Sequence, residues 1–346
     1  MFSKGFKIVD KKRFEIYVDI IDNKPDEAIV KIDVTAICKA DLRYYLGLRD
    51  KRVLGLKYPI NLLHEAIGTI LKDPTGNFQV GDKVVLCPNI VSKELKKEFQ
   101  ICNVKELGEN YCPKAQFASS NINGFSRNCI SYPVSNLILL PDNVQGKISV
   151  FSEMISVIFA AIRRINITND SRIAIWGDGI LGYILYCVLS ERKVREINVI
   201  GHNKEKLQAF TEANCYTTEE LEKHCPIIDI AFECVGGKGA ESAINQIIDK
   251  SNPGSKIVLT GVSENPVSIN TRKILEKGLS LYGVTRSNIE DFKNAVKLLN
   301  NEKFRKKIEY LVLSENSISD IKDYYNIFKL EANSRALGKH IMYFNF

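Results

Sequence analysis

The sequence predicts an α/β protein in which a β-rich section precedes a doubly wound parallel sheet. Residues 1–145 contain short strand-like runs and turns, whereas from about residue 149 apolar strand-like runs alternate with helical patterns. A G-x-G-x-x-G motif at 177–182 lies between one such run and the helix that follows it. The 346-residue chain is also long enough for about two domains.

The β-rich section shows the two-residue period of half-buried strands. Apolar and polar side chains alternate over 28–35, and a Gly-Asp turn at 81–82 leads into a strand-like run at 83–86. Residues 131–140 give a further strand pattern. These short strands predict an irregular β domain, either a barrel or a folded sheet.

The second section has continuous apolar runs, which are typical of strands covered on both faces of a parallel sheet. The predicted strands are 173–176, 197–200, 227–232 and 256–260. The predicted helices are 155–165, one from about 180, one from about 204, and 240–248. The tail from about residue 288 predicts one helix at 291–299 and a final strand at 340–343 that returns to the first section.

The G-x-G-x-x-G motif predicts a dinucleotide site, because it follows an apolar strand and opens an apolar helix. Its first glycine permits a tight turn, its second admits a pyrophosphate, and its third allows close packing of helix on strand. The phosphates are then expected at the helix N-terminus. The predicted cofactor-binding residues of the motif are Gly177, Gly179, Ile180, Leu181 and Gly182.

The end of the next strand predicts which dinucleotide is bound. NAD sites usually place a carboxylate there for the ribose 2′-hydroxyl, whereas this chain reads Gly201, His202, Asn203 and Lys204. A small residue followed by a lysine accepts a 2′-phosphate, so we predict NADP in preference to NAD. The alternative is that Lys204 is a solvated residue at the start of a helix.

Three separate segments supply side chains that suit a metal. They are Cys38 after a strand, the pair His64 and Glu65, and Glu153 at the start of a helix. Taken singly, a cysteine is usually core, a His-Glu pair usually surface, and a glutamate at a helix start usually a cap. Together they provide a thiolate, an imidazole and carboxylates, the ligand set of a catalytic Zn²⁺ with an open position.

The order Cys-x-x-Asp, His-Glu, Glu-x-x-Ser-Val and G-x-G-x-x-G resembles the zinc-dependent medium-chain dehydrogenase/reductase family. Its sorbitol dehydrogenase branch also has the doubled arginine found here at 163–164, and the resemblance continues at 232–237, 261–263 and 338–339. It implies a GroES-like catalytic domain over 1–148, a Rossmann NADP-binding domain over 149–286, and a C-terminal return over 287–346. It also implies a homodimer or homotetramer.

Segments 38–45, 176–183 and 233–237 are similar to those of the bacterial ribulose-5-phosphate reductases. That resemblance implies NADPH-dependent reduction of D-ribulose 5-phosphate to D-ribitol 5-phosphate, which supplies CDP-ribitol for teichoic acid or capsule polymers. A cytidylyltransferase acting on the product is then the expected pathway partner.

The resemblance implies one catalytic zinc per chain, with Cys38, His64 and Glu153 as first-choice ligands. Glu65 either binds the metal directly or exchanges with substrate and water. The family's usual Ser or Thr two residues after the cysteine is Ala40 here, so the proton comes either from water passed on by Glu65 or from the phenol of Tyr44. The four-cysteine structural zinc lobe is also missing, since the spacing of the cysteines at 87, 102, 112 and 129 does not suit paired ligands.

A guanidinium beside the metal predicts a phosphorylated substrate. Arg43 replaces the histidine that is usual five residues after the cysteine, and a guanidinium can bind a phosphate bidentately. Arg286 is a second candidate for this role. Arg49, Lys51 and Arg52 are weaker candidates, for which a solvated surface position is the better interpretation.

The net charge of +7, from 48 Lys and Arg against 41 Asp and Glu, fits several acidic partners. Because basic and acidic residues are interspersed and no nucleic-acid-binding signature is present, we predict no nucleic-acid partner. Residues 1–10 show no signal-peptide pattern, and the most apolar stretches contain charged residues, so we predict no membrane segment. Nine cysteines without C-x-x-C spacing indicate reduced thiols and a cytoplasmic enzyme.

Two other functions stay open. One is an NAD(P)-dependent polyol dehydrogenase of the sorbitol or xylitol type. The other is a non-catalytic protein that binds NADP and senses redox state. Zinc content separates the second from an enzyme, and a comparison of phosphorylated with free substrates separates the first.

Overall fold

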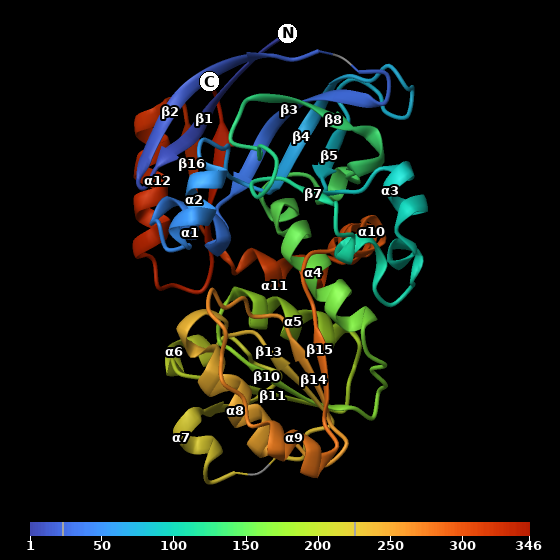
Figure 1. Ribbon diagram of the computed structural model, residues 1–346, viewed down its shortest axis with the longest axis vertical. Coiled ribbons are helices and arrows are strands. Elements are labelled where there is room, and N and C mark those ends of the chain that lie inside the picture. The colour runs from blue at the N-terminus through green and yellow to red at the C-terminus, as the bar shows by residue number, and fades with distance from the viewer. Residues whose placement is uncertain (23, 225) are drawn as a thin grey trace. The chain divides into compact units, whose positions relative to one another are not determined.

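The computed structural model describes residues 1–22, 24–224 and 226–346 (Figure 1). The chain divides into two units. The first unit consists of Met1–Ser156 together with Ser287–Phe346, and the second unit consists of Val157–Arg286. Both ends of the chain therefore fold into the first unit, and the second unit is a continuous segment.

The first unit is built on a seven-stranded sheet with the order β16-β17-β3-β4-β5-β9, in which β8 also pairs with β3. Its strands are β3 (Glu27–Ala36), β4 (Glu65–Lys72), β5 (Lys83–Leu86), β8 (Cys129–Pro133), β9 (Leu137–Leu139), β16 (Val312–Ile318) and β17 (Lys339–Phe344). Two two-stranded sheets accompany it: β1 (Phe2–Asp10) with β2 (Arg13–Ile20), and β6 (Asn89–Ile90) with β7 (Gln116–Phe117). The β-rich character predicted for this section is confirmed, as a folded sheet.

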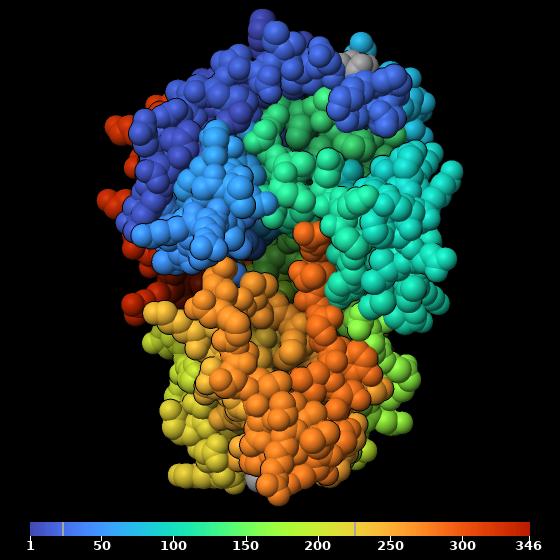
Figure 2. Space-filling view, in the orientation of Figure 1, coloured from blue at the N-terminus to red at the C-terminus, as the bar shows by residue number. Residues whose placement is uncertain are grey.

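The last strand of the chain returns to the first section, as its sequence pattern predicted. Strand β17 pairs antiparallel with β3, with Tyr343 opposite Val34, and parallel with β16. Figure 2 shows the red C-terminal residues directly beside the blue N-terminal ones. Every residue of β17 except Tyr343 is buried, so this strand belongs to the interior of the first unit.

The prediction of a single helix in the C-terminal tail is wrong. The tail contains α10 (Ile289–Leu299), α11 (Glu302–Glu309) and α12 (Ile321–Asn333). Helix α11 was missed because only Phe304 and Ile308 are buried in an otherwise charged segment. Four residues apart, these two side chains lie on one helical face, which is enough to pack a short helix against a core.

The second unit is a six-stranded parallel sheet with the order β12-β11-β10-β13-β14-β15. Its strands are β10 (Arg172–Trp176), β11 (Glu196–Gly201), β12 (Asn214–Thr217), β13 (Ile230–Glu233), β14 (Lys256–Leu259) and β15 (Ser280–Gly283). Its helices are α5 (Ile180–Glu191), α6 (Lys204–Leu207), α7 (Thr218–Leu221), α8 (Ala240–Lys250) and α9 (Thr271–Lys277). The strand order reverses between β10 and β13, which confirms the predicted doubly wound sheet.

The remaining helices are α1 (Lys39–Tyr45), α2 (Lys51–Lys57), α3 (Lys93–Glu98) and α4 (Ser152–Arg163). The longest described helix, α12, has 13 residues. In the described part of the chain, no helix combines the length and the apolarity that a bilayer crossing requires.

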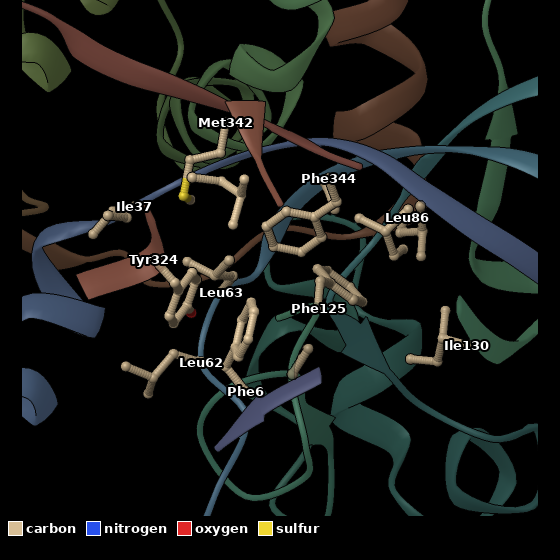
Figure 3. Close-up of a cluster of buried hydrophobic side chains, with 14 of the residues drawn as sticks. Phe6, Ile37, Leu62, Leu63, Leu86, Phe125, Ile130, Tyr324, Met342 and Phe344 are labelled. Atoms are coloured by element: carbon tan, nitrogen blue, oxygen red, sulfur yellow. The ribbon is translucent and has the colours of Figure 1, made fainter. Parts of the chain in front are cut away.

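The core of the first unit fixes the backbone on which the predicted metal ligands lie. Figure 3 shows side chains from the N-terminal, middle and C-terminal parts of the chain packed together, among them Phe6, Ile37, Leu62, Leu63, Phe125, Tyr324, Met342 and Phe344. The rings of Phe6 and Tyr324 stack with centroids 4.6 Å apart. Ile37 immediately precedes Cys38 and Leu63 immediately precedes His64, so burying the apolar residue places the ligand beside it.

Candidate metal centre and dinucleotide site

Three predicted ligands meet in the first unit. One ligand atom from each of Cys38, His64 and Glu65 lies within 4.8 Å of the other two. Cys38 is the N-cap of α1, His64 directly precedes β4, and Glu65 is the first residue of β4. His64 and Glu65 are buried and Cys38 is half-buried, so the cluster is largely withdrawn from water.

The segment before His64 is held in an unusual backbone conformation. Leu63 has φ +73, a left-handed value that costs a residue other than glycine about 1–3 kcal/mol. Phe125 donates its N–H to the carbonyl of Leu63 at 2.9 Å, which holds this conformation. A Cβ at Gly124 would lie 2.3 Å from the same carbonyl oxygen, so only glycine allows the two segments to approach.

Asp41 fixes the backbone beside two of the predicted ligands, Cys38 and His64. Its fully buried carboxylate accepts the N–H of Cys38 and the N–H of Leu63, each at 3.0 Å. Although burial alone would raise the pKa of Asp41, the neighbouring His64 and these N–H groups lower it. Asp41 is therefore a carboxylate that fixes the backbone on both sides of the cluster.

His64 is oriented through its Nδ1. This nitrogen lies 2.8 Å from the Ser119 Oγ and 3.6 Å from Oδ2 of Asp41, which leaves Nε2 as the nitrogen for a metal. Burial disfavours the imidazolium, but the charges of Asp41 and Cys38 outweigh burial and raise the pKa of His64 well above its usual value. An environment that attracts a proton so strongly also suits a divalent cation.

One carboxylate oxygen of Glu65 accepts a hydrogen bond from Lys339, and the other is available to a metal. Lys339 Nζ donates hydrogen bonds to Oε1 of Glu65 and, at 3.3 Å, to the carbonyl of Ile37. The other oxygen, Oε2, is buried and accepts no hydrogen bond from any described residue. A buried carboxylate oxygen without a partner is costly, and a metal bound by the cluster would satisfy it. The residues present therefore fit a zinc ion.

Glu153 lies beside the cluster and outside the 4.8 Å group. It is buried near the start of α4, where desolvation raises its pKa to about 7; the Glu65 charge adds to this rise, while His64 opposes it. The structure thus groups Glu65, rather than Glu153, with Cys38 and His64. The predicted role of Glu153 as a direct ligand stays a prediction.

The other predicted side chains of the active site lie in several places. Tyr44 is buried in the apolar core with its ring 4.4 Å from the Arg49 guanidinium carbon, and its carbonyl accepts the Tyr58 hydroxyl. Arg43 is half-buried on α1, the helix that Cys38 caps. Lys51 and Arg52 are exposed at the start of α2, whereas Arg286 is the last residue of the second unit.

The glycine-rich turn in the second unit has the shape that a dinucleotide needs. Gly177 has φ +127, and a Cβ there would lie 2.9 Å from the carbonyl carbon of Cys234. A Cβ at Gly182 would lie 2.1 Å from the Gly177 oxygen. A Cβ at Gly179, the N-cap of α5, would meet no atom within 4 Å. Two glycines thus permit close packing, and the third leaves the helix N-terminus open to a pyrophosphate.

The carboxylate of Asp178 lies at the end of β11, although Asp178 itself belongs to the loop that follows β10. Asp178 Oδ2 accepts the N–H groups of His202 at 2.9 Å and Asn203 at 2.8 Å. A Cβ at Gly201 would lie 2.7 Å from that oxygen, so the turn excludes a larger residue at 201. Lys204 is exposed and pairs with Glu220 at 3.1 Å. A 2′-phosphate would compete with Glu220 for Lys204.

Sequence reasoning assigned no role to Asp41, Ser119, Asp178 or Lys339. For Asp41 and Asp178 a local signal existed, since each is an acidic residue inside a motif already singled out. Ser119 and Lys339 come from distant segments, and only the folded chain brings them to His64 and Glu65.

Comparisons with known proteins agree with this geometry. Residues 24–142 match the alcohol dehydrogenase GroES-like domain, and residues 191–301 match the zinc-binding dehydrogenase domain. These two domains define the class as a zinc-binding dehydrogenase of the alcohol dehydrogenase type.

Full-length relatives narrow the class. Ribulose-5-phosphate reductase 1 of Staphylococcus aureus is 36% identical over 349 residues, covering 99% of both chains. The ribulose-5-phosphate reductase of Streptococcus pneumoniae is 34% identical over 340 residues, covering 96% of this chain and 95% of that protein. The crystal structure of S. aureus TarJ in complex with NADPH superposes with a TM-score of 0.86 at 32% identity and covers 100% of both chains. The chain therefore belongs to the family of zinc-binding dehydrogenases that contains the bacterial ribulose-5-phosphate reductases.

Proposed function

We propose that the protein is an NADPH-dependent reductase that converts D-ribulose 5-phosphate to D-ribitol 5-phosphate at a catalytic zinc. The observation that supports this most directly is the 34–36% identity with ribulose-5-phosphate reductases along nearly the whole chain. The buried cluster of Cys38, His64 and Glu65 supplies the ligands that such chemistry requires. The unit formed by Met1–Ser156 and Ser287–Phe346 is the proposed catalytic domain, and the unit Val157–Arg286 is proposed to bind the dinucleotide.

In the proposed site, Cys38, His64 and Glu65 would hold the zinc, and Glu153 is a buried carboxylate beside them. When bound, zinc supplies a Lewis acid for the ketone oxygen and NADPH supplies the hydride. Asp41 and Lys339 keep the ligands in place through the hydrogen bonds described above. The proton for the new hydroxyl comes from water passed on by Glu65 or from Tyr44, the two donors that the sequence suggested.

The second unit binds NADPH with its pyrophosphate at Gly179 and the start of α5. Gly201 has no acidic side chain, and the Asp178 carboxylate at this strand end already accepts the N–H groups of His202 and Asn203. The presence of Lys204 then favours a 2′-phosphate over a free hydroxyl. His202 and Asn203 line the same loop. The NADPH complex of S. aureus TarJ supports the choice of cofactor.

Arg43 and Arg286 are the proposed contacts for the substrate phosphate, because a guanidinium recognises a phosphate through two parallel hydrogen bonds. The product is suited to a cytidylyltransferase, so we propose that the enzyme supplies CDP-ribitol for teichoic acid or capsule polymers.

The eight cysteines in the described part of the chain are all free thiols, which suits a cytoplasmic location. We propose that the protein assembles as a homodimer or homotetramer. Light scattering after gel filtration measures its oligomeric state.

A turnover screen tests the proposed function. D-ribulose 5-phosphate, D-xylulose 5-phosphate and free D-ribulose are each offered with NADPH and with NADH, before and after removal of zinc by a chelator. We expect turnover of ribulose 5-phosphate with NADPH that stops without zinc and returns when zinc is restored. Failure of ribulose 5-phosphate under every condition contradicts the proposal.

The same screen separates the two other candidate functions. Oxidation of sorbitol or xylitol in preference to reduction of the phosphorylated ketose would identify a polyol dehydrogenase. Tight NADP binding without zinc and without turnover would identify a sensor.

A further inference from the structure

Glu233 is a fully buried carboxylate in the second unit for which the proposed chemistry has no use. It is the last residue of β13, at the carboxyl edge of the parallel sheet. Its Oε1 accepts the N–H groups of Val235 at 2.8 Å and Gly236 at 2.7 Å, and its Oε2 accepts the N–H of Gly261 at 2.9 Å. One side chain therefore joins the loop that follows β13 to the loop that follows β14.

The two loops are built closely around this carboxylate. A Cβ at Gly261 would lie 2.5 Å from both carboxylate oxygens, and Gly236 has φ +61 with the backbone of Val262 about 3.0 Å from where its Cβ would be. Gly237 donates its N–H to the carbonyl of Val262 at 2.9 Å. The loops are thus held to each other by main-chain groups, with Glu233 as the charged centre of the arrangement.

The loop after β13 also contacts the glycine-rich turn. A Cβ at Gly177 would meet the backbone of Cys234 at 2.9 Å, so Gly177 and Cys234 touch directly. Strands β10 and β13 are neighbours, and the strand order reverses between them. In doubly wound sheets the dinucleotide binds across this point, with one mononucleotide on each half of the sheet. The half that starts with β10 contains the pyrophosphate turn, so the half that starts with β13 receives the nicotinamide end.

We infer that Glu233 is a positioning residue for the nicotinamide half of the dinucleotide. It fixes the loops at 234–237 and 260–262, and these loops form the floor on which the nicotinamide mononucleotide rests. A buried charge is tolerated only where its hydrogen bonds are made, so the carboxylate imposes one geometry on three N–H groups that a neutral side chain could not satisfy together. This inference rests on the proposed function for the identity of the dinucleotide.

The same strand offers a matched control at its other end. Asp229 directly precedes β13 at the amino edge of the sheet and accepts the Arg172 N–H at 2.9 Å. It also pairs with the Arg172 guanidinium at 2.8 Å. Asp229 and Glu233 both hold main-chain groups of neighbouring segments, but only Glu233 lies at the edge where a dinucleotide binds.

The test compares Glu233→Gln with Asp229→Asn in the zinc-loaded enzyme. Dissociation constants are measured by calorimetry for NADPH and for 2′,5′-ADP, which contains only the adenosine half. In Glu233→Gln the new amide NH₂ faces an N–H donor, so at least one loop loses its acceptor. We expect the NADPH dissociation constant to rise by about tenfold, while that of 2′,5′-ADP stays within about twofold. Asp229→Asn should leave both constants unchanged.

Two results overturn the inference. One is an unchanged NADPH constant in folded Glu233→Gln, and the other is an equal loss of affinity for both ligands. If Glu233→Gln does not fold, Gly261→Ala replaces it. Its Cβ would meet both carboxylate oxygens at 2.5 Å and the main-chain nitrogen of Gly236, so it displaces the two loops while the charge remains, and the same selective loss is expected. Wild-type protein that binds NADPH without reducing ribulose 5-phosphate contradicts the proposed function, and the inference is then judged on the ligand affinities alone.

Discussion

Lys339 donates a hydrogen bond from its ammonium to Oε1 of Glu65, although 274 positions separate the two residues along the chain. Both side chains are buried, and each residue begins a strand, β17 and β4, on either side of β3. Burial alone would lower the pKa of Lys339, but the charges of Glu65 and Cys38 outweigh burial and raise it. The C-terminal strand thus supplies a permanent positive charge to a metal cluster made by the N-terminal half of the catalytic domain.

Replacing Lys339 should destabilise the first unit. In Lys339→Met the Glu65 carboxylate stays buried without its counter-charge, and breaking a buried pair on one side costs about 3–5 kcal/mol. Urea denaturation of metal-free wild type and variant measures this loss. Zinc should recover part of it, because the metal provides a positive charge at the same carboxylate.

Lys147→Met is the matched control. Lys147 pairs with Glu315 at 2.6 Å in the same unit, but both side chains are substantially exposed. Such pairs contribute at most about 1 kcal/mol, so this variant should unfold close to wild type. Equal losses in the two variants would mean that Glu65 does not depend on Lys339.

Zinc content distinguishes the ligands. Because Cys38, His64 and Glu65 form the close group, Cys38→Ser and Glu65→Gln should each lose most of the bound zinc, whereas Glu153→Gln should retain it. Elemental analysis after gel filtration measures the metal per chain. Cys129→Ser, which removes a buried thiol outside the group, should keep one zinc. Zinc loss in Glu153→Gln alone would make Glu153 the ligand and Glu65 its partner.

Sequence could predict Cys38, His64 and the glycine turn because their chemistry is local. Each lies within a few residues of a strand end. The strands before Cys38 and before the glycine turn were predicted from their sequence patterns, whereas β4, which follows His64, was not. The role of Lys339 could not be predicted in the same way. The strand pattern of the tail predicts its return to the first section, but not the pairing of β17 with β3 that brings Lys339 to Glu65. Ser119 is a similar case, because it reaches His64 from a loop 55 residues away.

The tail helices show a second limit of sequence reasoning. Helix α12 buries Tyr324, Ile327 and Phe328, which share one face only when the chain is helical. The apolar residues at 321, 324, 325 and 328 follow the helical period, so this helix was predictable from its pattern and the sequence analysis missed it. The parallel sheet of the second unit was easier to predict, because its strands are apolar on both faces and stand out against the helices.

The contribution of His340 to stability should fall as the pH falls. Burial lowers the pKa of this imidazole from its usual 6.5, and its Nδ1 lies 2.7 Å from the Ser314 Oγ. The folded state therefore favours the neutral ring, so its contribution is present above the unfolded pKa and is lost as pH falls through the folded pKa. Between about pH 7.5 and about pH 5.5, His340→Gln should lose less stability than wild type.

Denaturation curves at the two pH values measure this difference, with the exposed His224→Gln as control. The control should follow the wild-type profile. A His340→Gln profile as steep as that of wild type would assign the acid sensitivity to other groups.

Arg43 should determine affinity for the phosphorylated substrate. It lies on α1, the helix that Cys38 caps, so the metal and the guanidinium share one rigid element. Losing a charge-assisted contact to phosphate should raise KM for ribulose 5-phosphate in Arg43→Ala by about 10–100-fold, with a smaller change in kcat. Zinc content and NADPH affinity should stay at wild-type values, because neither depends on this side chain. Arg52→Ala, an exposed arginine on the next helix, is the control and should leave KM unchanged. Steady-state kinetics on both variants decides the point: an unchanged KM in Arg43→Ala would remove Arg43 from the phosphate site and leave Arg286 as the remaining candidate.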